Sequence, residues 1–442
     1  MTFCPYSAPT LKRRNLAIHA AILSLACAGP ALAAPGERIG ARIEVEPGTS
    51  LPVIGSSAAG DFVVAWTPTR SSGVVRARRF DADGVAAGDA FVVANSEAAA
   101  GAASVAMNAS GAFVIAWATP RTTVVPLVFG TVTRPGRVMA RRYAPGGVPL
   151  GEAFEVSPEG DEVDVAIDDD GDIAVAWAVD GNRGTVSLFV PVGYLALRTL
   201  DLRFAGVDRI AVRRYAADGS AFAPVTIDRQ IELLGRGASG VTVAMDADGD
   251  HAVVWSRRIG RERSQIVAQR FNAEGEATGD ETIINSSPVT GRDTTSGPDA
   301  AMSPDGTLAV TWQPDLDFSP SASARIAVRA PDNTVRVTEF AAAAGNGELA
   351  VLPKIAIDAL GNLRIAAGSN APISSRPLQT RLFDFNGVPL TATTPVLPAP
   401  MNTSPQISAI STDGAGRSAI AHSFLPTDFT GARLSVQRFA GP

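Results

Sequence analysis

The chain has 442 residues, of which 46% are hydrophobic and 19% are charged. This balance supplies material for a sizeable core and excludes a wholly disordered chain. The 44 acidic residues outnumber the 38 basic ones, which argues against a nucleic-acid-binding protein, and the 42 Gly and 31 Pro argue against a mostly helical one.

Residues 1–33 have the layout of a secretory signal peptide. A basic cluster at 12–14, an apolar run at 16–27 and an Ala-Leu-Ala cleavage motif ending at Ala33 follow one another in the expected order. The apolar run is shorter than the roughly 20 residues of a membrane-spanning helix, and no later stretch is longer, so no transmembrane segment is expected. The sequence therefore predicts cleavage before Ala34 and a secreted or periplasmic mature protein.

Both cysteines, Cys4 and Cys27, lie in this first segment. The mature protein is therefore expected to have no disulfide and no cysteine metal ligand. Lipid attachment at Cys27 is not expected, because Ser24 stands where the lipoprotein motif prefers Leu. Removing the segment leaves 35 basic and 44 acidic residues, so the mature chain is more acidic than the precursor.

The remainder of the chain repeats one phrase. Each of the five Trp residues ends a segment that begins with Gly six positions earlier, as in GDFVVAW at 60–66. Two weaker copies follow at 361–367 and 414–422, and in the last one Ile420 or His422 takes the Trp position. The seven copies are anchored at Gly60, Gly111, Gly171, Gly249, Gly306, Gly361 and Gly414. Their intervals of 51 to 78 residues are typical of a solenoid or a propeller.

Each copy reads as four short strands. A first strand such as TVAMDADG at 242–249 ends in an Asp/Gly turn, and the Trp strand follows it as in a hairpin. A third strand ends in Arg and an aromatic residue, as in RARRFDADG at 76–84, and a second Gly turn leads to a fourth strand such as 88–95. Both faces of the Trp strand are apolar, so neighbouring blades must cover both of them.

The two ends of the chain predict how the ring closes. The chain stops at SVQRFAGP (435–442), after a third strand, and the segment GARIEVE (40–46) resembles the missing fourth strand. Pairing these segments would hide the sheet edges that an open array exposes. The sequence predicts an all-β fold, a single seven-bladed β-propeller of four-stranded blades over 34–442, with the N-terminal strand completing the last blade. The two weak copies leave six or eight blades open.

The repeat resembles the DGDFVVAW…RRFDADG-type repeats of exported bacterial β-propeller proteins. The resemblance covers residues 40–441. It implies the propeller fold and export, and it brings no agreed reaction with it.

Two Asp-rich turns are candidate calcium sites. Their carboxylates are Asp168, Asp170, Asp172, Asp246, Asp248 and Asp250. Calcium takes several oxygen ligands from loops of this kind, but the bidentate acid of an EF-hand would have to stand at Val179 or Arg257. Because Asp and Gly also form hairpin turns without an ion, plain turns and no cofactor are expected, with calcium as the alternative.

Other polar residues give weaker indications of chemistry. Arg–aromatic pairs such as Arg79–Phe80 could bind an anion, but their recurrence at one place in successive copies favours contacts between blades. His251 and His422 are isolated from each other in the sequence, and no metalloprotease or serine-hydrolase motif occurs.

Two insertions, at about 118–137 and 178–208, interrupt the repeat between its second and third strands. From the Trp to the third-strand aromatic the count is 14 in the first copy and 16 in the fourth, but 26 in the second and 38 in the third. The candidate binding residues in these insertions are Phe129, Phe189, Tyr194, Leu197 and Phe204. An apolar surface of this kind indicates a partner or a ligand groove, although the loops could also pack on each other as a cap.

Two classes of function remain open. The leading hypothesis is an exported binding or scaffold module that holds a protein or glycan partner through loops on one face. The alternative is a carbohydrate-active hydrolase or lyase with paired carboxylates at the central channel. Nothing in the sequence selects such a pair, so binding is preferred and catalysis is left open.

Overall fold

The computed structural model describes most of the chain from Ala33 onward. The described residues are 33–48, 50–68, 74–94, 103–124, 130–180, 184–191, 197–203, 206–232, 238–260, 262–291, 297–315, 322–343, 348–369, 377–396, 408–424 and 433–442. The chain divides into Met1–Leu32, which lies outside these ranges, and Ala33–Pro442. The expected signal peptide therefore lies outside the described residues, except for Ala33. Within the described ranges there is no helix that could cross a membrane.

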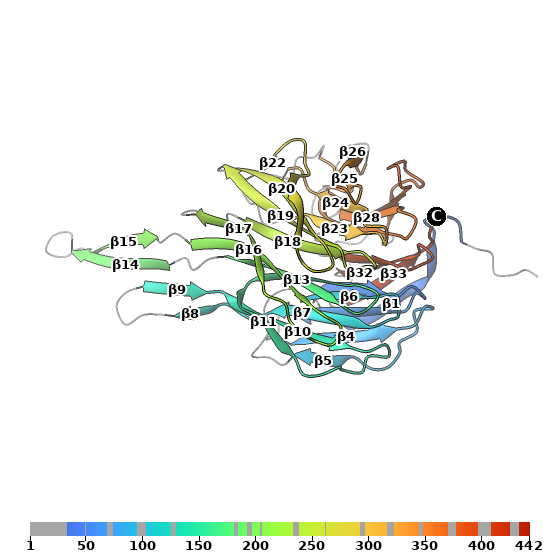
Figure 1. The fold of residues 1–442 in the computed structure, drawn as a ribbon, viewed down its shortest axis with the longest axis horizontal. Coiled ribbons are helices and arrows are strands. Elements are labelled where there is room, and N and C mark those ends of the chain that lie inside the picture. Colours follow the sequence, from blue (N-terminus) through green and yellow to red (C-terminus); the bar gives the residue numbers. More distant parts are fainter. Residues whose placement is uncertain are drawn as a thin grey trace, which may run out of the picture. The chain divides into compact units, whose positions relative to one another are not determined.

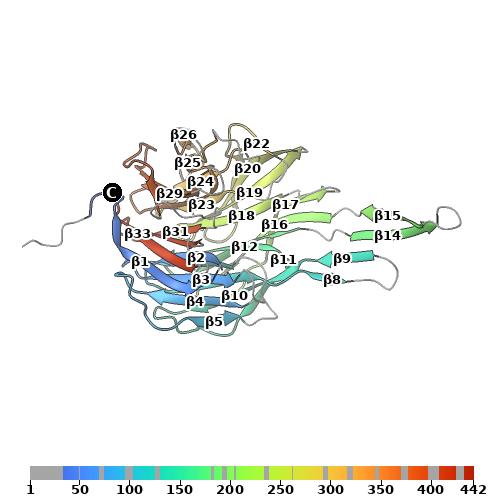
Figure 2. The ribbon, with the colours of Figure 1, turned by 180° about the vertical axis from the view of Figure 1, so that it is seen from behind.

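Seven antiparallel sheets form the blades of a ring (Figures 1 and 2). Blade 1 contains β2 (Ser50–Ser56), β3 (Phe62–Pro68), β4 (Val75–Phe80) and β5 (Phe91–Ala94). Blade 2 contains β6 (Ala103–Met107), β7 (Phe113–Ala118), β10 (Gly136–Tyr143) and β11 (Phe154–Gly160). Blade 3 contains β12 (Glu162–Ile167), β13 (Ile173–Val179), β16 (Gly206–Tyr215) and β17 (Val225–Glu232).

The remaining blades repeat this order. Blade 4 contains β18 (Ala238–Met245), β19 (His251–Gly260), β20 (Arg263–Phe271) and β21 (Ala277–Ile283), with the short β22 (Val289–Thr290) paired to β20. Blade 5 contains β23 (Asp299–Met302), β24 (Leu308–Trp312), β25 (Arg325–Arg329) and β26 (Val335–Ala341). Blade 6 contains β27 (Val351–Ile357), β28 (Leu363–Gly368), β29 (Leu378–Phe383) and β30 (Thr394–Pro395). Blade 7 contains β31 (Ser408–Thr412), β32 (Ser418–Phe424), β33 (Arg433–Phe439) and β1 (Arg38–Pro47).

The ring closes as the sequence predicts. The N-terminal strand β1 pairs antiparallel with the C-terminal strand β33 and becomes the outer strand of blade 7. In Figure 1 the two strands, at opposite ends of the colour scale, lie side by side. The seven-bladed, all-β architecture is therefore confirmed, and six or eight blades are excluded.

In the seventh copy the structure selects one of the two registers that the sequence left open, and it moves the turn glycine from Gly414 to Gly416. The glycine with positive φ there is Gly416 (φ 73°), two residues after Gly414, and its N–H donates to the Asp413 carbonyl. Counting six positions from Gly416 places His422 where the other copies have Trp, and His422 pairs with Ser408 and Ser435 as a Trp would. The seventh copy has no Trp and has two glycines at its turn, so the sequence alone did not identify the turn glycine.

The core lies between blades rather than within them. On β3, the side chains of Phe62, Val64 and Trp66 pack with residues of blade 7, while Val63 and Ala65 pack with residues of blade 2. Four of the five Trp side chains are at most 1% exposed and Trp177 is 5% exposed. Both faces of each Trp strand are thus covered, as the apolar alternation requires.

The two insertions form an eighth sheet outside the seven blades. The hairpin β8 (Thr122–Val124) and β9 (Gly130–Arg134) leaves blade 2, and the hairpin β14 (Gly184–Pro191) and β15 (Leu197–Arg203) leaves blade 3. Strand β9 pairs with β14, which gives the order β15-β14-β9-β8. We call this the insertion sheet; Figure 1 shows its strands extending beyond the blades.

Candidate functional site

The Asp-rich turns use their carboxylates to hold the backbone. Asp168 Oδ1 accepts hydrogen bonds from the N–H groups of Gly171 (2.8 Å) and Asp172 (2.7 Å). Asp246 Oδ1 accepts one from the N–H of Asp248 (3.1 Å). These are the bonds of side-chain-capped turns.

The second oxygen of each buried turn carboxylate faces the next blade. A Cβ on Gly249 would lie 2.9 Å from Asp168 Oδ2, and one on Gly306 would lie 3.2 Å from Asp246 Oδ2. The same contact recurs from Asp358 to Gly416 (2.8 Å) and from Asp413 to Gly60 (2.9 Å). The repeated Asp and Gly therefore fit one blade against its neighbour, and the glycine leaves space for the carboxylate.

The other candidate calcium ligands are dispersed. Asp172 receives the Arg214 guanidinium (2.9 Å) and the N–H of Ala217 (2.7 Å), whereas the Asp170 side chain is exposed. Among the described residues no group of three His, Cys, Asp or Glu side chains is placed to hold a metal ion.

Burial, followed by the charge of Asp250, raises the pKa of Asp246 to about 6.

The Arg–aromatic pairs connect neighbouring blades. Arg142 donates to the carbonyls of Gly171 (2.6 Å) and Ala217 (3.0 Å), which belong to the two turns of blade 3. Arg270 donates in the same way to Gly306 (3.0 Å) and Ala330 (3.0 Å) of blade 5. The expected contact between blades is thus present at these pairs.

Blade 6 makes this contact from a different strand. Its third strand has Leu382 where other blades have the arginine, and Leu382 pairs with Arg364 on β28. Arg364 is 1% exposed, donates to the Ala440 carbonyl (2.6 Å) and lies over the Phe439 ring. Burial lowers the pKa of Arg364 to about 10. The arginine and the aliphatic residue have changed places across the strand pair.

A cavity of about 480 Å³ lies at the centre of the ring. It is lined by the first strand of every blade, namely β2, β6, β12, β18, β23, β27 and β31. Such a central cavity on a rigid scaffold is a natural place for a ligand.

One residue per blade forms a ring around this cavity. Each member pairs with the residue directly before the Trp position of its own blade. The members are Val53, Ser104, Asp164, Thr242, Asp299, Lys354 and Ala409. We call this set the channel ring. Its polar members occupy the five consecutive blades 2 to 6, and its apolar members occupy blades 7 and 1.

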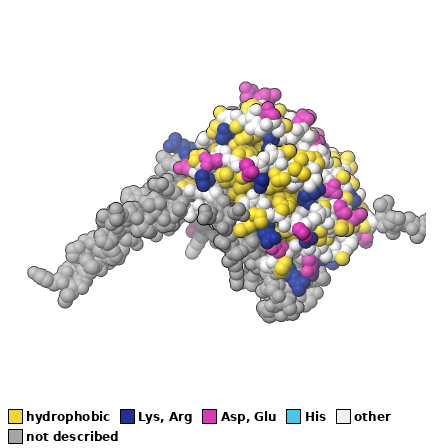
Figure 3. Space-filling view, turned by 90° about the horizontal axis from the view of Figure 1, so that it is seen from below, with side chains coloured by type: hydrophobic (Ala, Val, Ile, Leu, Met, Phe, Trp, Pro, Cys, Tyr) yellow, Lys and Arg dark blue, Asp and Glu magenta, His cyan; other side chains and the backbone are white. Residues whose placement is uncertain are grey.

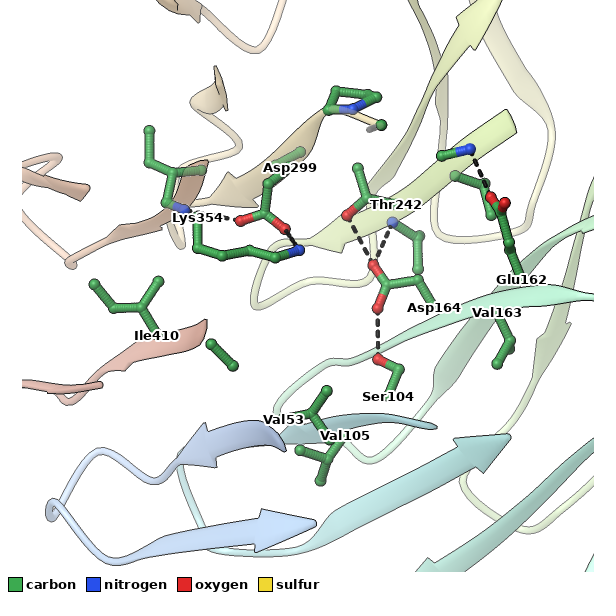
Figure 4. A pocket seen from close by; sticks show the side chains of 18 of the residues that line it. Val53, Ser104, Val105, Glu162, Val163, Asp164, Thr242, Asp299, Lys354 and Ile410 are labelled. Atoms are coloured by element: carbon green, nitrogen blue, oxygen red, sulfur yellow. Dashed lines mark hydrogen bonds and ion pairs between the residues drawn. The ribbon is translucent and has the colours of Figure 1, made fainter. Parts of the chain in front are cut away.

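Hydrogen bonds join the polar members of the channel ring (Figure 4). Asp164 accepts from the hydroxyl of Ser104 through one oxygen, and from the Thr242 hydroxyl (2.8 Å) and the Val243 N–H (2.9 Å) through the other. Each of these donors belongs to a neighbouring blade, so the network fixes the spacing of three first strands.

The second polar cluster contains an ion pair. Lys354 Nζ donates to Asp299 Oδ1 (2.8 Å), and the Ile355 N–H donates to Asp299 Oδ2 (2.8 Å). Burial alone would lower the pKa of Lys354, but the charge and hydrogen bond of Asp299 raise it, so the ammonium stays protonated at neutral pH. Burial raises the pKa of Asp299. Lys354 is the only lysine after Lys12, in a chain whose other cationic side chains are Arg.

An ionic contact holds the base of the insertion sheet. Arg121, the residue before β8, pairs with Asp161 (2.9 Å) at the start of blade 3 and with Asp180 (2.7 Å), which follows β13. Asp161 Oδ2 also accepts the N–H of Asp180 (2.9 Å). Residues near both hairpins are thereby tied together, and Glu162, which lines the cavity, follows Asp161 directly in the chain.

The predicted binding residues of the insertions are only partly covered by the structure. Phe189 lies in β14 and Leu197 lies in β15, but their side chains are outside the described part of the chain. Phe129, Tyr194 and Phe204 lie outside the described residues altogether. The pairing of β9 with β14 shows that the two insertions do pack on each other.

The two histidines are buried at separate places. His251 occupies the position of Phe62 and Phe113 in other blades and stacks on Phe271 with ring centroids 5.1 Å apart. Burial lowers the pKa of both His251 and His422 to about 4. Both imidazoles are therefore neutral at pH 7 and belong to the core.

Sequence reasoning missed the channel ring and the Arg121 contact. The ring residues share no residue type, so the repeat does not reveal them. A usable indication was Lys354, because a single lysine among so many arginines marks a special position.

No family model matches this chain, and no curated protein matches its sequence. Solved structures that resemble it include a protein of unknown function from Dyadobacter fermentans, at 11% identity and TM-score 0.46, covering 93% of this chain and 100% of the other. An α-L-arabinofuranosidase from Fusarium graminearum matches at 8% identity and TM-score 0.42, with 90% and 98% covered. An α-L-arabinanase from Penicillium chrysogenum matches at 12% identity and TM-score 0.38, with 90% and 97% covered. The fold rests on the strand pairing above, and these likenesses carry no argument about activity.

Proposed function

We propose that this chain is an exported β-propeller that acts as a binding or scaffold module and holds a protein or glycan partner on its insertion sheet. The observation that carries the proposal is the joining of two hairpins from adjacent blades into one sheet separate from the ring. The insertion sheet is not one of the seven blades of the ring, so a role other than ring closure is proposed for it.

The insertion sheet has the properties of a docking element. Among the strands that the structure describes, β8 and β15 each pair on one side only, so their outer edges could accept a further strand. The sequences of its hairpins, including TVSLFVP at 185–191, are largely apolar. An apolar sheet with two open edges favours a protein partner over a glycan.

The base of the sheet is held firmly enough to present a partner. The Arg121 contact to Asp161 and Asp180 involves carboxylates that are only 7% and 12% exposed. A partly buried ion pair with two acceptors orders its surroundings better than an exposed single pair. The two hairpins therefore leave the ring in a defined direction.

The central carboxylates have a structural role. Both oxygens of Asp164 and both oxygens of Asp299 accept hydrogen bonds from neighbouring blades. This role supports binding as the first candidate function, and a hydrolase or lyase is the second candidate.

Export is part of the proposal and rests on the first segment. The basic, apolar and small-residue order of residues 1–33 is that of a signal peptide. The compact unit begins at Ala33, beside the expected cleavage position. The exported-propeller repeat type agrees with this destination.

In Figure 3 acidic and basic side chains are interspersed on the face in view, without a basic patch for nucleic acid.

The test compares the mature protein with a variant that lacks both hairpins. Thr122 pairs with Arg134, and Thr185 pairs with Arg203, so the cut ends lie side by side. Residues 122–134 and 184–203 can each be replaced by Asn-Gly, a two-residue hairpin turn. Affinity capture from the envelope and culture fluid of the source organism should retain a partner with the intact protein and lose it with the variant.

A matched control separates this surface from general stickiness. Phe222 is 43% exposed at the outer turn of blade 3, away from the insertion sheet. We expect Phe189→Ser to reduce capture at least fivefold and Phe222→Ser to leave it unchanged. Capture that survives removal of both hairpins would contradict the proposal.

A further inference from the structure

We propose that the channel ring is a binding site for a neutral, hydroxyl-rich ligand of the size of one or two sugar units. The site is independent of the insertion sheet. It lies where the first strands of all seven blades meet, and the cavity there has a volume of about 480 Å³.

The hydrogen-bonding capacity of the polar arc matches hydroxyl groups. Lys354 Nζ uses one N–H for Asp299 and keeps two more, and Lys354 lines the cavity with a half-buried side chain. Each Asp299 oxygen accepts one bond and retains a further lone pair. The Ser104 and Thr242 hydroxyl protons are already donated to Asp164, so the free donors of the arc are on Lys354 and lie beside the acceptors of Asp299. A hydroxyl group both donates and accepts. A row of vicinal hydroxyls satisfies such an arc better than a purely donating or purely accepting ligand.

The charge of the arc disfavours anions. The arc contains two carboxyl groups, on Asp164 and Asp299, and a single ammonium, on Lys354, which already pairs with Asp299. A carboxylate or phosphate ligand would therefore meet more acidic than basic groups. A neutral polyol avoids this cost.

The opposite wall of the cavity is apolar. Val53 and Ala409 complete the channel ring in blades 1 and 7, and Val105 and Ile410 extend this wall. Figure 4 shows Val53, Val105 and Ile410 beside the polar arc. A sugar ring has one C–H-rich face and a rim of hydroxyls, which fits a site with one apolar wall and one polar arc.

Tight backbone packing limits the site on one side. A Cβ on Gly240 would lie 2.1 Å from the Cα of Gly297, so β18 touches the segment just before β23. Glu162 accepts the Gly240 N–H (2.6 Å) at the same level. This level lies toward the end from which the insertions leave, because Glu162 pairs with Ala178 just before Asp180.

The single lysine of the ring gives a direct measurement. Because Lys12 and Lys354 are the only lysines, acetylation of Lys354 by an amine-reactive ester can be followed on its own peptide by mass spectrometry. We expect neutral mono- and disaccharides from a panel of pentoses and hexoses to slow acetylation of Lys354 at least fivefold. Gluconate and glucuronate, the matched anions, should slow it less than twofold.

Variants assign the effect to the channel ring. The double variant Asp299→Asn/Lys354→Met removes both charges together, so neither is left buried alone, and calorimetry should show at least tenfold weaker sugar binding. Ala409→Phe fills the cavity from its apolar wall and should abolish binding without touching the polar network. The control Arg336→Met, on the outer strand β26, should bind as the unmodified protein does.

The outcomes are distinct. Equal acetylation rates with and without every neutral sugar would overturn the proposal, as would stronger protection by the anionic sugars. Unchanged binding in Ala409→Phe would place the sugar elsewhere and would also overturn it. The variant without the insertion hairpins should keep full sugar binding, so failure of the partner proposal leaves this test unaffected.

Discussion

At the scale of single residues, the turn glycines are fixed by the neighbouring blade as well as by their own backbone. Gly249 has φ 93°, and the Asp168 carboxylate occupies the space that its Cβ would need. Gly146 has nearly the same φ, 97°, but nothing lies within 4 Å of its Cβ position. A comparison of substitutions at these two glycines therefore distinguishes the cost of backbone strain from the cost of crowding by the neighbouring blade.

Alanine substitutions at these two glycines should have different costs. Gly146→Ala carries only the strain of a side chain at positive φ, about 1–3 kcal/mol. Gly249→Ala carries this strain and a further ~1–3 kcal/mol from overpacking against Asp168. Urea unfolding measures the difference. Equal losses in the two variants would show that Asp168 does not crowd Gly249.

His251 should make the protein sensitive to acid. Its pKa is lowered to about 4 by burial in the native state, while an unfolded histidine titrates near 6.5. Below pH 6.5 the unfolded state therefore binds the proton first, and stability falls until the pH reaches about 4. Asp246 acts in the opposite direction over part of this range, because its pKa is raised to about 6.

The substitution His251→Phe isolates this effect. Phenylalanine already stands at the equivalent positions 62 and 113, where it stacks on the third-strand aromatic at 4.9 Å and 4.6 Å. We expect the loss of unfolding free energy between pH 7 and pH 4 to be about 3 kcal/mol smaller in His251→Phe, with Asp246 contributing equally to both proteins. Parallel pH profiles from urea titrations would refute this role of His251.

At the scale of strands, the arginine between blades can be supplied from either of two paired positions. Five blades place it on the third strand, and blade 6 places it at Arg364 on the second strand, opposite Leu382. Both solutions bring a guanidinium to carbonyls of the next blade. The contact between blades is thus kept, whether the arginine stands on the second or on the third strand.

An exchange of the two residues tests this equivalence. Arg364→Val should destabilise the protein by about 2–3 kcal/mol, since it removes charge-assisted bonds from a buried carbonyl. The double variant Arg364→Val/Leu382→Arg restores the arrangement of the other blades and should recover at least half of the loss. Thermal unfolding of the two variants decides the matter, and a double variant less stable than the single one would contradict it.

The sequence predicted the strands well where the repeat is spelled clearly. The Gly-to-Trp phrase and the Arg–aromatic phrase mark the second and third strands, because burial on both faces and the contact between blades restrict those residues. In blade 7 the segment Asp413-Gly-Ala-Gly416 offers two glycines, so the sequence left the register open between Ile420 and His422 and placed the anchor at Gly414 instead of Gly416.

The site was harder to predict than the strands. The channel ring takes one residue from each blade, and its chemistry depends on which unlike residues meet across the ring. Likewise, the four strands β10 to β13 lie between 122–134 and 184–203 in the sequence. The pairing of β9 with β14 therefore could not be derived from either hairpin alone. The repeat pattern indicates which residues are buried. Which residues of different blades contact each other is seen only in the closed ring.

At the scale of the whole molecule, ring closure organises both proposed sites. Pairing of β1 with β33 fixes seven blades in a circle, which gives the central cavity its wall of seven first strands. Blades 2 and 3 are neighbours in this circle, and their insertions share one sheet. Glu162 lines the cavity and pairs with Ala178, so the cavity extends toward the end from which the insertion of blade 3 leaves.

The most direct test of the central claim is site-specific photo-crosslinking in the source organism. Phe189, in β14, would be replaced by p-benzoylphenylalanine in the full-length chain, and Phe222 would be replaced in a matched control. We expect a discrete crosslinked species at position 189 that is absent at position 222. Crosslinks at neither position, or the same species at both, would contradict a partner held on the insertion sheet.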